Sequence, residues 1–356
     1  MAVLSAETPA QTPVLAHGGR ILPAVTVDSY NEELRDENGF VGDRASGRAF
    51  RSILDDWRER LRNARQDPFG DVPTEELSKS KLDKVLAGSD PIAAGLVHTA
   101  VEEFATELAT VVRRFLRLAP WQGTERIVVG GGLSASQIGH LAMGRAAVML
   151  AGEGLAVELR AIESHPDEAG LVGAVHLAPS WVLAGHDAIL AADIGGTNMR
   201  VGIVKLNMKK GDLAKAAVWK RLHWRHRDDG PGREAALERL GEMLKELVAK
   251  ATSEKLKLAP FLGVGCPGLI DEKGIIVAGG QNLPGNWEGN SFNLAADLTA
   301  RLDRIQGNEP AVVIHNDAVV QGLSEIPRTK DVTRWGVFTI GTGLGNARFT
   351  NRETDR

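Results

Sequence analysis

Three glycine-rich turns, each placed directly after an apolar strand-like run, constrain this 356-residue chain more than any other feature. The turns begin at Gly130, at Asp193 and at Gly341. Glycine lets main-chain N–H groups approach an anion without obstruction by a Cβ atom, so turns of this kind suit phosphate binding. Strand-like and helical segments alternate along the chain, which predicts an α/β fold.

The spacing of apolar residues predicts the individual elements. Apolar residues recur at three- and four-residue intervals over 44–65, 74–87 and 90–117, which is typical of helices that face a core. Two strand-like runs flank Gly195 and Gly196 and a third follows them, which predicts an antiparallel meander. The other expected elements are a loose arm over 1–28 with a strand near 20–27, further strands near 126–129, 156–161, 261–265, 275–278, 311–315, 337–340 and 347–349, and helices up to about 151, over 168–177 and over 233–251.

Composition excludes several classes of function. Lys and Arg total 42 against 46 Asp and Glu, a formal net charge of -4, so no basic field favours a nucleic-acid partner. The single cysteine, Cys266, excludes an intramolecular disulfide and a zinc site built from several thiolates. The sequence has neither a signal-peptide pattern nor a run of about 18 uncharged apolar residues, so we expect a cytoplasmic protein without a membrane partner.

The turn at Asp193 combines groups that a nucleotide phosphate site needs. Gly195 and Gly196 expose main-chain donors, and Thr197 and Asn198 complete the turn with a hydroxyl and an amide. The Asp193 carboxylate, at the end of a strand, can hold a hydrated Mg²⁺. The alternative is an ordinary hairpin turn with a capping aspartate.

A second phosphate turn is predicted at Gly341. Gly341, Thr342 and Gly343 lie between two strand-like runs, and alternating glycines leave one side of the backbone open to a triphosphate. Together with the turn at Asp193, this turn would form a clamp around the phosphates. The alternative is a flexible β-turn without a ligand.

A general base is expected after the apolar run 311–315. Asp317 follows this run and can accept the proton of an attacking hydroxyl, while the neighbouring Asn316 can orient the substrate. The alternative role for Asp317 is to cap the helix that follows. His315 is expected to be a packed strand residue rather than a catalyst.

The turn at Gly130 also satisfies a dinucleotide-binding pattern. Gly130, Gly132 and Ala135 occupy the positions of G-x-G-x-x-A after a strand, and Glu158 lies in the next strand, where it could contact a ribose. A flavin or nicotinamide oxidoreductase is therefore an alternative. Against it, a helical layer precedes the pattern, and the other two turns would have no role.

Taken together, the motifs resemble the ROK family of bacterial sugar kinases and repressors, within the actin-like, hexokinase-like ATPases. This resemblance covers about residues 20–350 and implies two actin-like (ribonuclease H-like) lobes with a nucleotide cleft between them. The segments that carry the resemblance are 193–200, 341–345, 316–317, the strand-to-loop segment 263–271, and the loop 282–287, which is similar to the family's sugar-side loop.

The order of the motifs differs from that of the family and implies a circular permutation. Family members begin with the hairpin found here at Asp193 and end with the triple-glycine turn found here at Gly130, so we expect the former termini to be joined through about 178–187. The expected organisation is a C-terminal-type lobe at 1–186, an N-terminal-type lobe at 187–330, and strands at 331–356 that return to the first lobe.

The resemblance implies an ATP-dependent kinase that phosphorylates a hydroxyl of a hexose or related sugar, with Asp317 as the general base. It implies substrate contacts at Asn316, Asn282 and Gly268, and possible assembly as a homodimer. The implied nucleotide-binding residues are Asp193, Gly195, Gly196, Thr197, Asn198, Gly341, Thr342, Gly343, Gly131 and Gly132, with Mg²⁺ held by Asp193 through water.

Two departures from the family pattern concern the sugar pocket. The family's Glu-x-Gly-His motif corresponds to residues 21–24, which contain neither Glu nor His. The family's zinc cysteines correspond to residues 29–40, which contain no cysteine, so zinc is not expected. A catalytically impaired nucleotide-binding protein or a regulator therefore stays open, although the first 43 residues lack the helical pattern of a helix-turn-helix.

Overall fold

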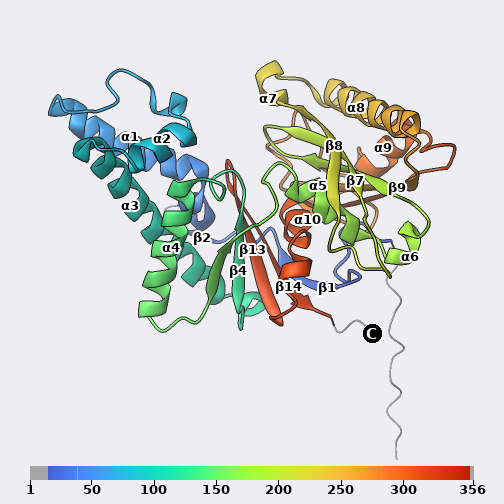
Figure 1. Cartoon of the computed structure of the whole chain (residues 1–356), viewed down its shortest axis with the longest axis horizontal. Coiled ribbons are helices and arrows are strands. Elements are labelled where there is room, and N and C mark those ends of the chain that lie inside the picture. Colours follow the sequence, from blue (N-terminus) through green and yellow to red (C-terminus); the bar gives the residue numbers. More distant parts are fainter. Residues whose placement is uncertain (1–14, 38, 353–356) are drawn as a thin grey trace, which may run out of the picture.

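The computed structural model describes residues 15–37 and 39–352, and this part of the chain contains two five-stranded mixed sheets (Figure 1). The predicted arm over 1–28 lies partly outside the described residues. The part that is described runs along one sheet, since the Gly18 N–H donates to the Ile314 carbonyl.

The first sheet combines strands from both ends of the described chain with strands from its middle. Its order is β1 (Val25–Tyr30), β14 (Leu344–Asn351), β13 (Arg334–Ile340), β4 (Arg126–Gly130) and β5 (Glu158–Ala161). The last three are mutually parallel, whereas β13, β14 and β1 form an antiparallel ribbon.

The second sheet has the same pattern of strand directions. Its order is β12 (Ala311–Asn316), β9 (Leu258–Cys266), β6 (Ala188–Ile194), β7 (Met199–Lys205) and β8 (Ala217–Trp224). The first three are mutually parallel, and β6, β7 and β8 form the antiparallel meander that the sequence predicts. Two short ribbons add β2 (Arg35–Asp36) with β3 (Gly39–Phe40) and β10 (Leu269–Ile270) with β11 (Ile276–Ala278).

Separate groups of helices cover the two sheets. In Figure 1, α1 (Gly47–Asn63), α2 (Lys79–Leu86), α3 (Pro91–Leu116) and α4 (Gln137–Gly152) form a helical layer beside the first sheet, and their buried side chains form one core. The second sheet packs against α8 (Arg233–Ser253) and α9 (Leu294–Leu302). Shorter elements are α5 (Ala169–Gly173), α6 (Ser180–Leu183), α7 (His226–Asp229), α10 (Asp317–Leu323) and the 3-10 turns η1 (Val41–Ala45), η2 (Thr74–Glu76), η3 (Ala119–Trp121), η4 (Ala174–Leu177) and η5 (Ile326–Arg328).

The two sheets meet through α5 and α10, which belong to a third core shared by both sheets. The approach is so close that a Cβ atom on Gly173 would lie 1.7 Å from the Val320 carbonyl oxygen. Because real Cβ atoms cannot approach so closely, only glycine allows these helices to pack in this way.

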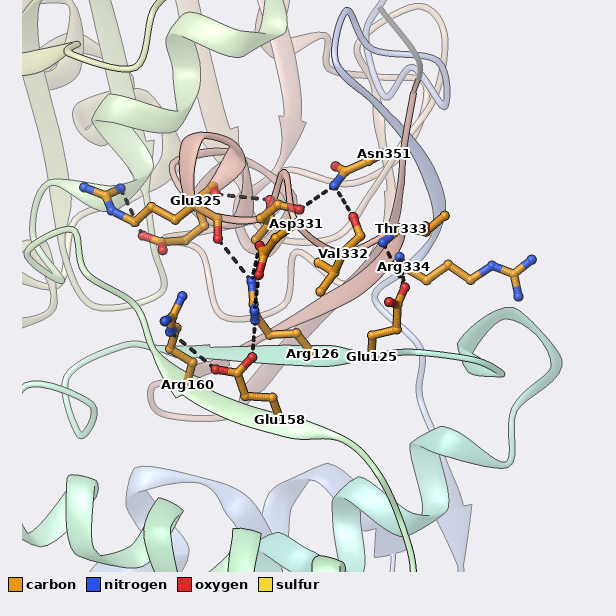
Figure 2. A network of polar contacts seen from close by, with 12 residues as sticks. Glu125, Arg126, Glu158, Arg160, Glu325, Asp331, Val332, Thr333, Arg334 and Asn351 are labelled. Atoms are coloured by element: carbon orange, nitrogen blue, oxygen red, sulfur yellow. Dashed lines mark hydrogen bonds and ion pairs between the residues drawn. The ribbon is translucent and has the colours of Figure 1, made fainter.

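A polar network anchors the segment that leads from α10 to β13 and so from one sheet to the other (Figure 2). The Arg126 guanidinium donates to both carboxylate oxygens of Asp331 at 2.8 Å and to Glu158 at 2.5 Å. The Asn351 amide donates to the carbonyl oxygens of Thr329 and Val332 at 2.6 and 2.7 Å. Bidentate and charge-assisted bonds of this kind restrict the connection between the sheets.

The strand register and the mixed sheet contradict the alternative of a dinucleotide-binding site at the Gly130 turn. Glu158 is in register with Arg126, so it lies at the amino ends of the parallel strands, whereas the turn after Gly130 lies at their carboxyl ends. A ribose-binding carboxylate must lie at the carboxyl ends, beside the bound nucleotide. Glu158 instead forms an ion pair with Arg126, and β4 lies in a sheet with antiparallel strands.

A fully buried arginine stabilises the helical layer. The Arg58 side chain has no exposed surface and forms an ion pair with Asp67 at 3.0 Å, where the Asp67 side chain is 4% exposed. Its remaining N–H groups donate to the Thr74 hydroxyl and to the Val72 carbonyl oxygen. These bonds connect α1 to the loop that leads into α2.

We expect Arg58→Met to destabilise the protein by about 3–5 kcal/mol, because the substitution leaves the Asp67 carboxylate buried without its main partner. Urea unfolding followed by circular dichroism measures the change. The matched control is Arg62→Met, whose side chain is 41% exposed, and a change below about 1 kcal/mol is expected there. Equal stability of the two variants would contradict this assignment.

Candidate functional site

Two carboxylates lie at the carboxyl ends of two strands of the second sheet that are separated by β9. Asp193 is in β6, and Asp317 directly follows β12. Because both strands run parallel to β9, their carboxyl ends meet at the same edge of the sheet. Asp193 is 4% exposed, and its charge acts on Asp317. The structure thus brings the predicted metal-binding and base residues together.

Asp317 has the protonation behaviour of a general base. Burial, followed by the negative charge of Asp193, raises the pKa of Asp317 to about 7. The Ala318 N–H donates to Asp317 Oδ1 at 2.9 Å. A carboxylate with a pKa near 7 exchanges a proton readily at neutral pH, which is the property that a base in hydroxyl activation needs.

Asn316, rather than Asp317, caps α10. Its Oδ1 accepts hydrogen bonds from the Ala318 and Val319 N–H groups, and its Nδ2 donates to the Gly268 carbonyl oxygen at 3.0 Å. Asn316 is 2% exposed. Its amide therefore positions Asp317 and the turn at Gly268. A direct contact of Asn316 with the substrate stays a prediction.

An ion-pair chain reaches Asp193 from the adjacent strand β7, where Arg200 is in register with Asp193. Arg200 on β7 donates to Asp193 Oδ2 at 3.2 Å and to Asp167 Oδ1 at 2.8 Å, and Asp167 precedes α5. Burial nevertheless raises the pKa of Asp193. A buried carboxylate with a second carboxylate near it suits a hydrated Mg²⁺, which commonly uses one or two carboxylates together with water and phosphate oxygens.

The two remaining glycine turns follow adjacent parallel strands. Thr339 in β13 is in register with Gly130 in β4, so both turns leave the same edge of the first sheet. Gly131 has φ +87°, and a Cβ atom on it would lie 2.4 Å from the Ile340 carbonyl oxygen. The turns at Gly130 and Gly341 therefore lie side by side, as a shared nucleotide site requires.

The helical layer contacts these turns, which the periodicity of its sequence did not indicate. The Gly47 N–H at the start of α1 donates to the Gly341 carbonyl oxygen at 2.9 Å, and Arg48 Nε donates to that of Thr342 at 3.0 Å. The amino end of α1 therefore faces the turn at Gly341, where its partial positive charge favours a bound anion.

Lys79 is a candidate site residue that sequence reasoning missed. Its Nζ lies 2.5 Å from where a Cβ atom of Gly132 would be, so the ammonium group sits directly on the triple-glycine turn. Burial, followed by the charge of Arg51, lowers the pKa of Lys79. Among the described residues, Lys79 has no carboxylate partner in an ion pair. No sequence signal marks it, because its contact with Gly132 exists only in three dimensions.

The turn at Asp193 packs against the predicted sugar-side loop. A Cβ atom on Gly196 would lie 2.8 Å from the Asn282 Cβ atom, so the loop residue and the turn are neighbours. The Asn198 side chain pairs with His223 Nε2 at 2.8 Å, and the Gly195 N–H donates to the Asn198 carbonyl oxygen. Asn198 therefore stabilises the turn itself.

Residues 21–24, where the sequence predicts the position of the family's Glu-x-Gly-His motif, form the turn before β1. The Leu22 N–H donates to the Val25 carbonyl oxygen, and Leu22 is buried. His315 is fully buried, and its Nε2 lies 3.1 Å from the Gly19 carbonyl oxygen, which confirms the expectation of a packed strand residue. Burial lowers the pKa of His315 to about 4, so this ring is neutral at pH 7.

Within residues 15–37 and 39–352, no helix is long and apolar enough to cross a membrane. No group of three or more His, Cys, Asp or Glu side chains in the same residues could hold a metal ion.

The two mixed sheets, with glycine turns and buried carboxylates at their strand ends, are consistent with the two lobes of the actin-like, hexokinase-like ATPases. Residues 189–355 match the sequence pattern of the ROK family.

Several known proteins are similar to about half of the chain. It is 27% identical over 165 residues to a glucokinase of Thermotoga maritima, a match that covers 46% of this chain and 44% of the glucokinase. A Listeria monocytogenes protein described as a candidate N-acetylmannosamine kinase is 26% identical, with a TM-score of 0.34 over 46% of this chain and 47% of that one. A candidate sugar kinase from Cytophaga hutchinsonii is 20% identical, with a TM-score of 0.34 over 46% of this chain and 48% of that one. The chain thus spans less than half the length of each of these relatives.

The raised pKa of Asp317 predicts a pH-dependent stability. Its pKa is about 7 in the folded protein against an ordinary value of 3.8, so the folded state binds more protons between these values. The stabilisation that this proton provides is complete at low pH and is lost as the pH rises through 7. An amide at this position does not titrate, so Asp317→Asn does not lose this stabilisation as the pH rises. We therefore expect the melting temperature of the variant to rise relative to that of the wild type between pH 5 and pH 8.

Differential scanning calorimetry at a series of pH values makes this measurement. Asp228→Asn is the control, because the Asp228 side chain is 64% exposed. A melting-temperature difference between Asp317→Asn and the wild type that does not change with pH would refute the raised pKa.

Proposed function

We propose that this protein is an ATP-dependent kinase that phosphorylates a hydroxyl of a hexose or related sugar. The observation that carries the proposal is the carboxylate pair Asp193 and Asp317, in which burial and mutual repulsion raise the pKa of Asp317 to about 7. The homology of residues 189–355 to sugar kinases supports the same reaction class.

In the proposed reaction, the Asp317 carboxylate accepts the proton of the sugar hydroxyl. The hydroxyl oxygen forms a bond to the γ-phosphorus of ATP as the bond from that phosphorus to the β,γ-bridging oxygen breaks, and ADP leaves. Asn316 holds Asp317 in place by capping α10, and its bond to the Gly268 carbonyl oxygen orients the turn against which the sugar would lie.

The glycine turns would hold the phosphates. Gly195, Gly196 and Thr197 offer donors from one sheet, and Gly341, Thr342 and Gly343 offer donors from the other. Gly131, Gly132 and the Lys79 ammonium would bind the nucleotide beside them. Mg²⁺, held by Asp193 through water, would supply positive charge to the phosphate oxygens.

The chain order fits a circular permutation of this fold. Along the chain, the strands of the second sheet come in the order β6, β7, β8, β9, β12. The strands of the first sheet occupy the same positions within their sheet when they are taken in the order β13, β14, β1, β4, β5. Val25 in β1 is in register with Asn351 in β14, so a short turn would suffice to join these strands. This correspondence supports lobes formed by residues 1–186 with 331–356 and by residues 187–330.

A nucleotide-binding protein without sugar turnover is the second candidate. Residues 21–24 supply neither the Glu nor the His that the family uses toward the sugar. A pocket that loses hydrogen-bonding groups loses discrimination between hydroxylated substrates. Nucleotide binding without ADP release on any sugar would favour this candidate.

Asp317→Asn is expected to lower sugar-dependent ADP release by about 10²–10⁴-fold, because the hydroxyl loses its proton acceptor. In the wild type, kcat/KM should rise with pH up to about 7, where Asp317 becomes ionised. A coupled ADP-release assay with Mg-ATP and a panel of hexoses, amino sugars and N-acetylated sugars measures both effects. Asp228→Asn should retain wild-type turnover, and near-normal turnover in Asp317→Asn would exclude it as the base.

Lys79→Met is expected to weaken nucleotide binding by at least about tenfold, because a charge-assisted contact to the nucleotide is lost. Titration with a fluorescent ATP analogue measures the dissociation constant. Lys84→Met, an exposed position on the same helix, is the matched control. Unchanged affinity in Lys79→Met would remove this residue from the nucleotide site without affecting the role of Asp317.

A further inference from the structure

A cavity of about 480 Å³ lies at the edge of the first sheet, away from the candidate active site. It is lined by β1 and the segment before it, by the start of β13, by β14, and by η3 with the residue that follows it. Arg334, which lines it, is the first residue of β13, whereas the turn at Gly341 follows the last. At about 3.3 Å per residue, about 20 Å of strand separates the two places.

Three arginines line this cavity with a single carboxylate. Arg20, Arg334 and Arg348 contribute the guanidinium groups, and Asp28 contributes the carboxylate. Arg20 and Arg334 are exposed, and among the described residues neither forms an ion pair. With three guanidinium groups and one carboxylate, the cavity carries an excess of positive charge. Like charges gathered in one place repel one another, and a bound anion would neutralise this excess.

The third arginine is held rigidly. The Arg348 side chain is 5% exposed and forms an ion pair with Asp28. It also donates to the Thr350 hydroxyl at 2.9 Å and to the Gln122 carbonyl oxygen at 3.1 Å, while its buried Nε has no partner within the described part of the chain. Asp28 accepts a further hydrogen bond from the Thr350 hydroxyl at 2.8 Å. The carboxylate is therefore already occupied and does not neutralise Arg20 or Arg334.

We propose that this cavity, which we call the arginine cavity, binds a small molecule that bears a phosphate group. A guanidinium group donates two parallel hydrogen bonds to a phosphate, and the unpaired Arg20 and Arg334 provide two such groups. The volume lies within the range of small-molecule sites, and the remaining wall is lined by Thr26, Val27, Ala119, Pro120 and Gln122. The site is formed by residues outside the candidate kinase site, so the inference does not depend on the proposed kinase activity.

Isothermal titration of the whole protein with inorganic phosphate and, separately, with a hexose 6-phosphate tests the proposal. We expect saturable binding of at least one probe, and a weakening of at least about tenfold in the double variant Arg20→Met, Arg334→Met. Tighter binding of the hexose phosphate identifies an esterified ligand, and equal or tighter binding of inorganic phosphate identifies the free ion.

The double variant separates this cavity from the nucleotide cleft. Both arginines are exposed, so the variant should fold, and its circular dichroism spectrum and melting temperature check this. Arg239→Met on α8, which removes an exposed arginine from the other sheet's helices, should bind both probes as the wild type does. Absence of saturable binding in the wild type, or unchanged binding in the double variant, would overturn the proposal.

Discussion

The packing of α5 against α10 is the contact on which the remaining structure depends. At Gly173 the two helices approach within a distance that no side chain allows, and the third core, shared by both sheets, surrounds this contact. α10 begins at Asp317, and Gly170 of α5 lies against the Asp193 side chain. A bulkier residue at position 173 would push the helices apart and move both carboxylates.

The candidate site has an acidic and a basic side. Burial of Asp193 and Asp317 near one another costs free energy, and the raised pKa values are the measure of that cost. Arg200 offsets part of it by pairing with Asp193 and Asp167. On the other side, Lys79 and the amino end of α1 contribute positive charge beside the glycine turns. The carboxylates would suit the cation of the proposed magnesium nucleotide, and the donors would suit its phosphates.

Local patterns were sufficient for most elements. The meander of β6 to β8, the helix α8 and the helices of the helical layer follow from alternation and from three- and four-residue periodicity, and the structure confirms them. The same patterns could not assign individual side chains. Asn316 and Asp317 are adjacent in sequence and equally suited to cap a helix, and only the backbone geometry gives that role to Asn316. Glu158 has the sequence spacing of a ribose contact, but the parallel register with Arg126 places it at the wrong end of the sheet.

The sequence by itself determined the α/β class and the position of the glycine turns, because these depend on residue type, periodicity and short-range spacing. Only the tertiary structure decided which distant residues meet. Lys79 reaches Gly132 because α2 packs beside the first sheet, and Arg20 faces Arg334 and Arg348 because β1 pairs with β14. Such contacts arise from the mutual burial of helices and sheets, so no local stretch of sequence encodes them.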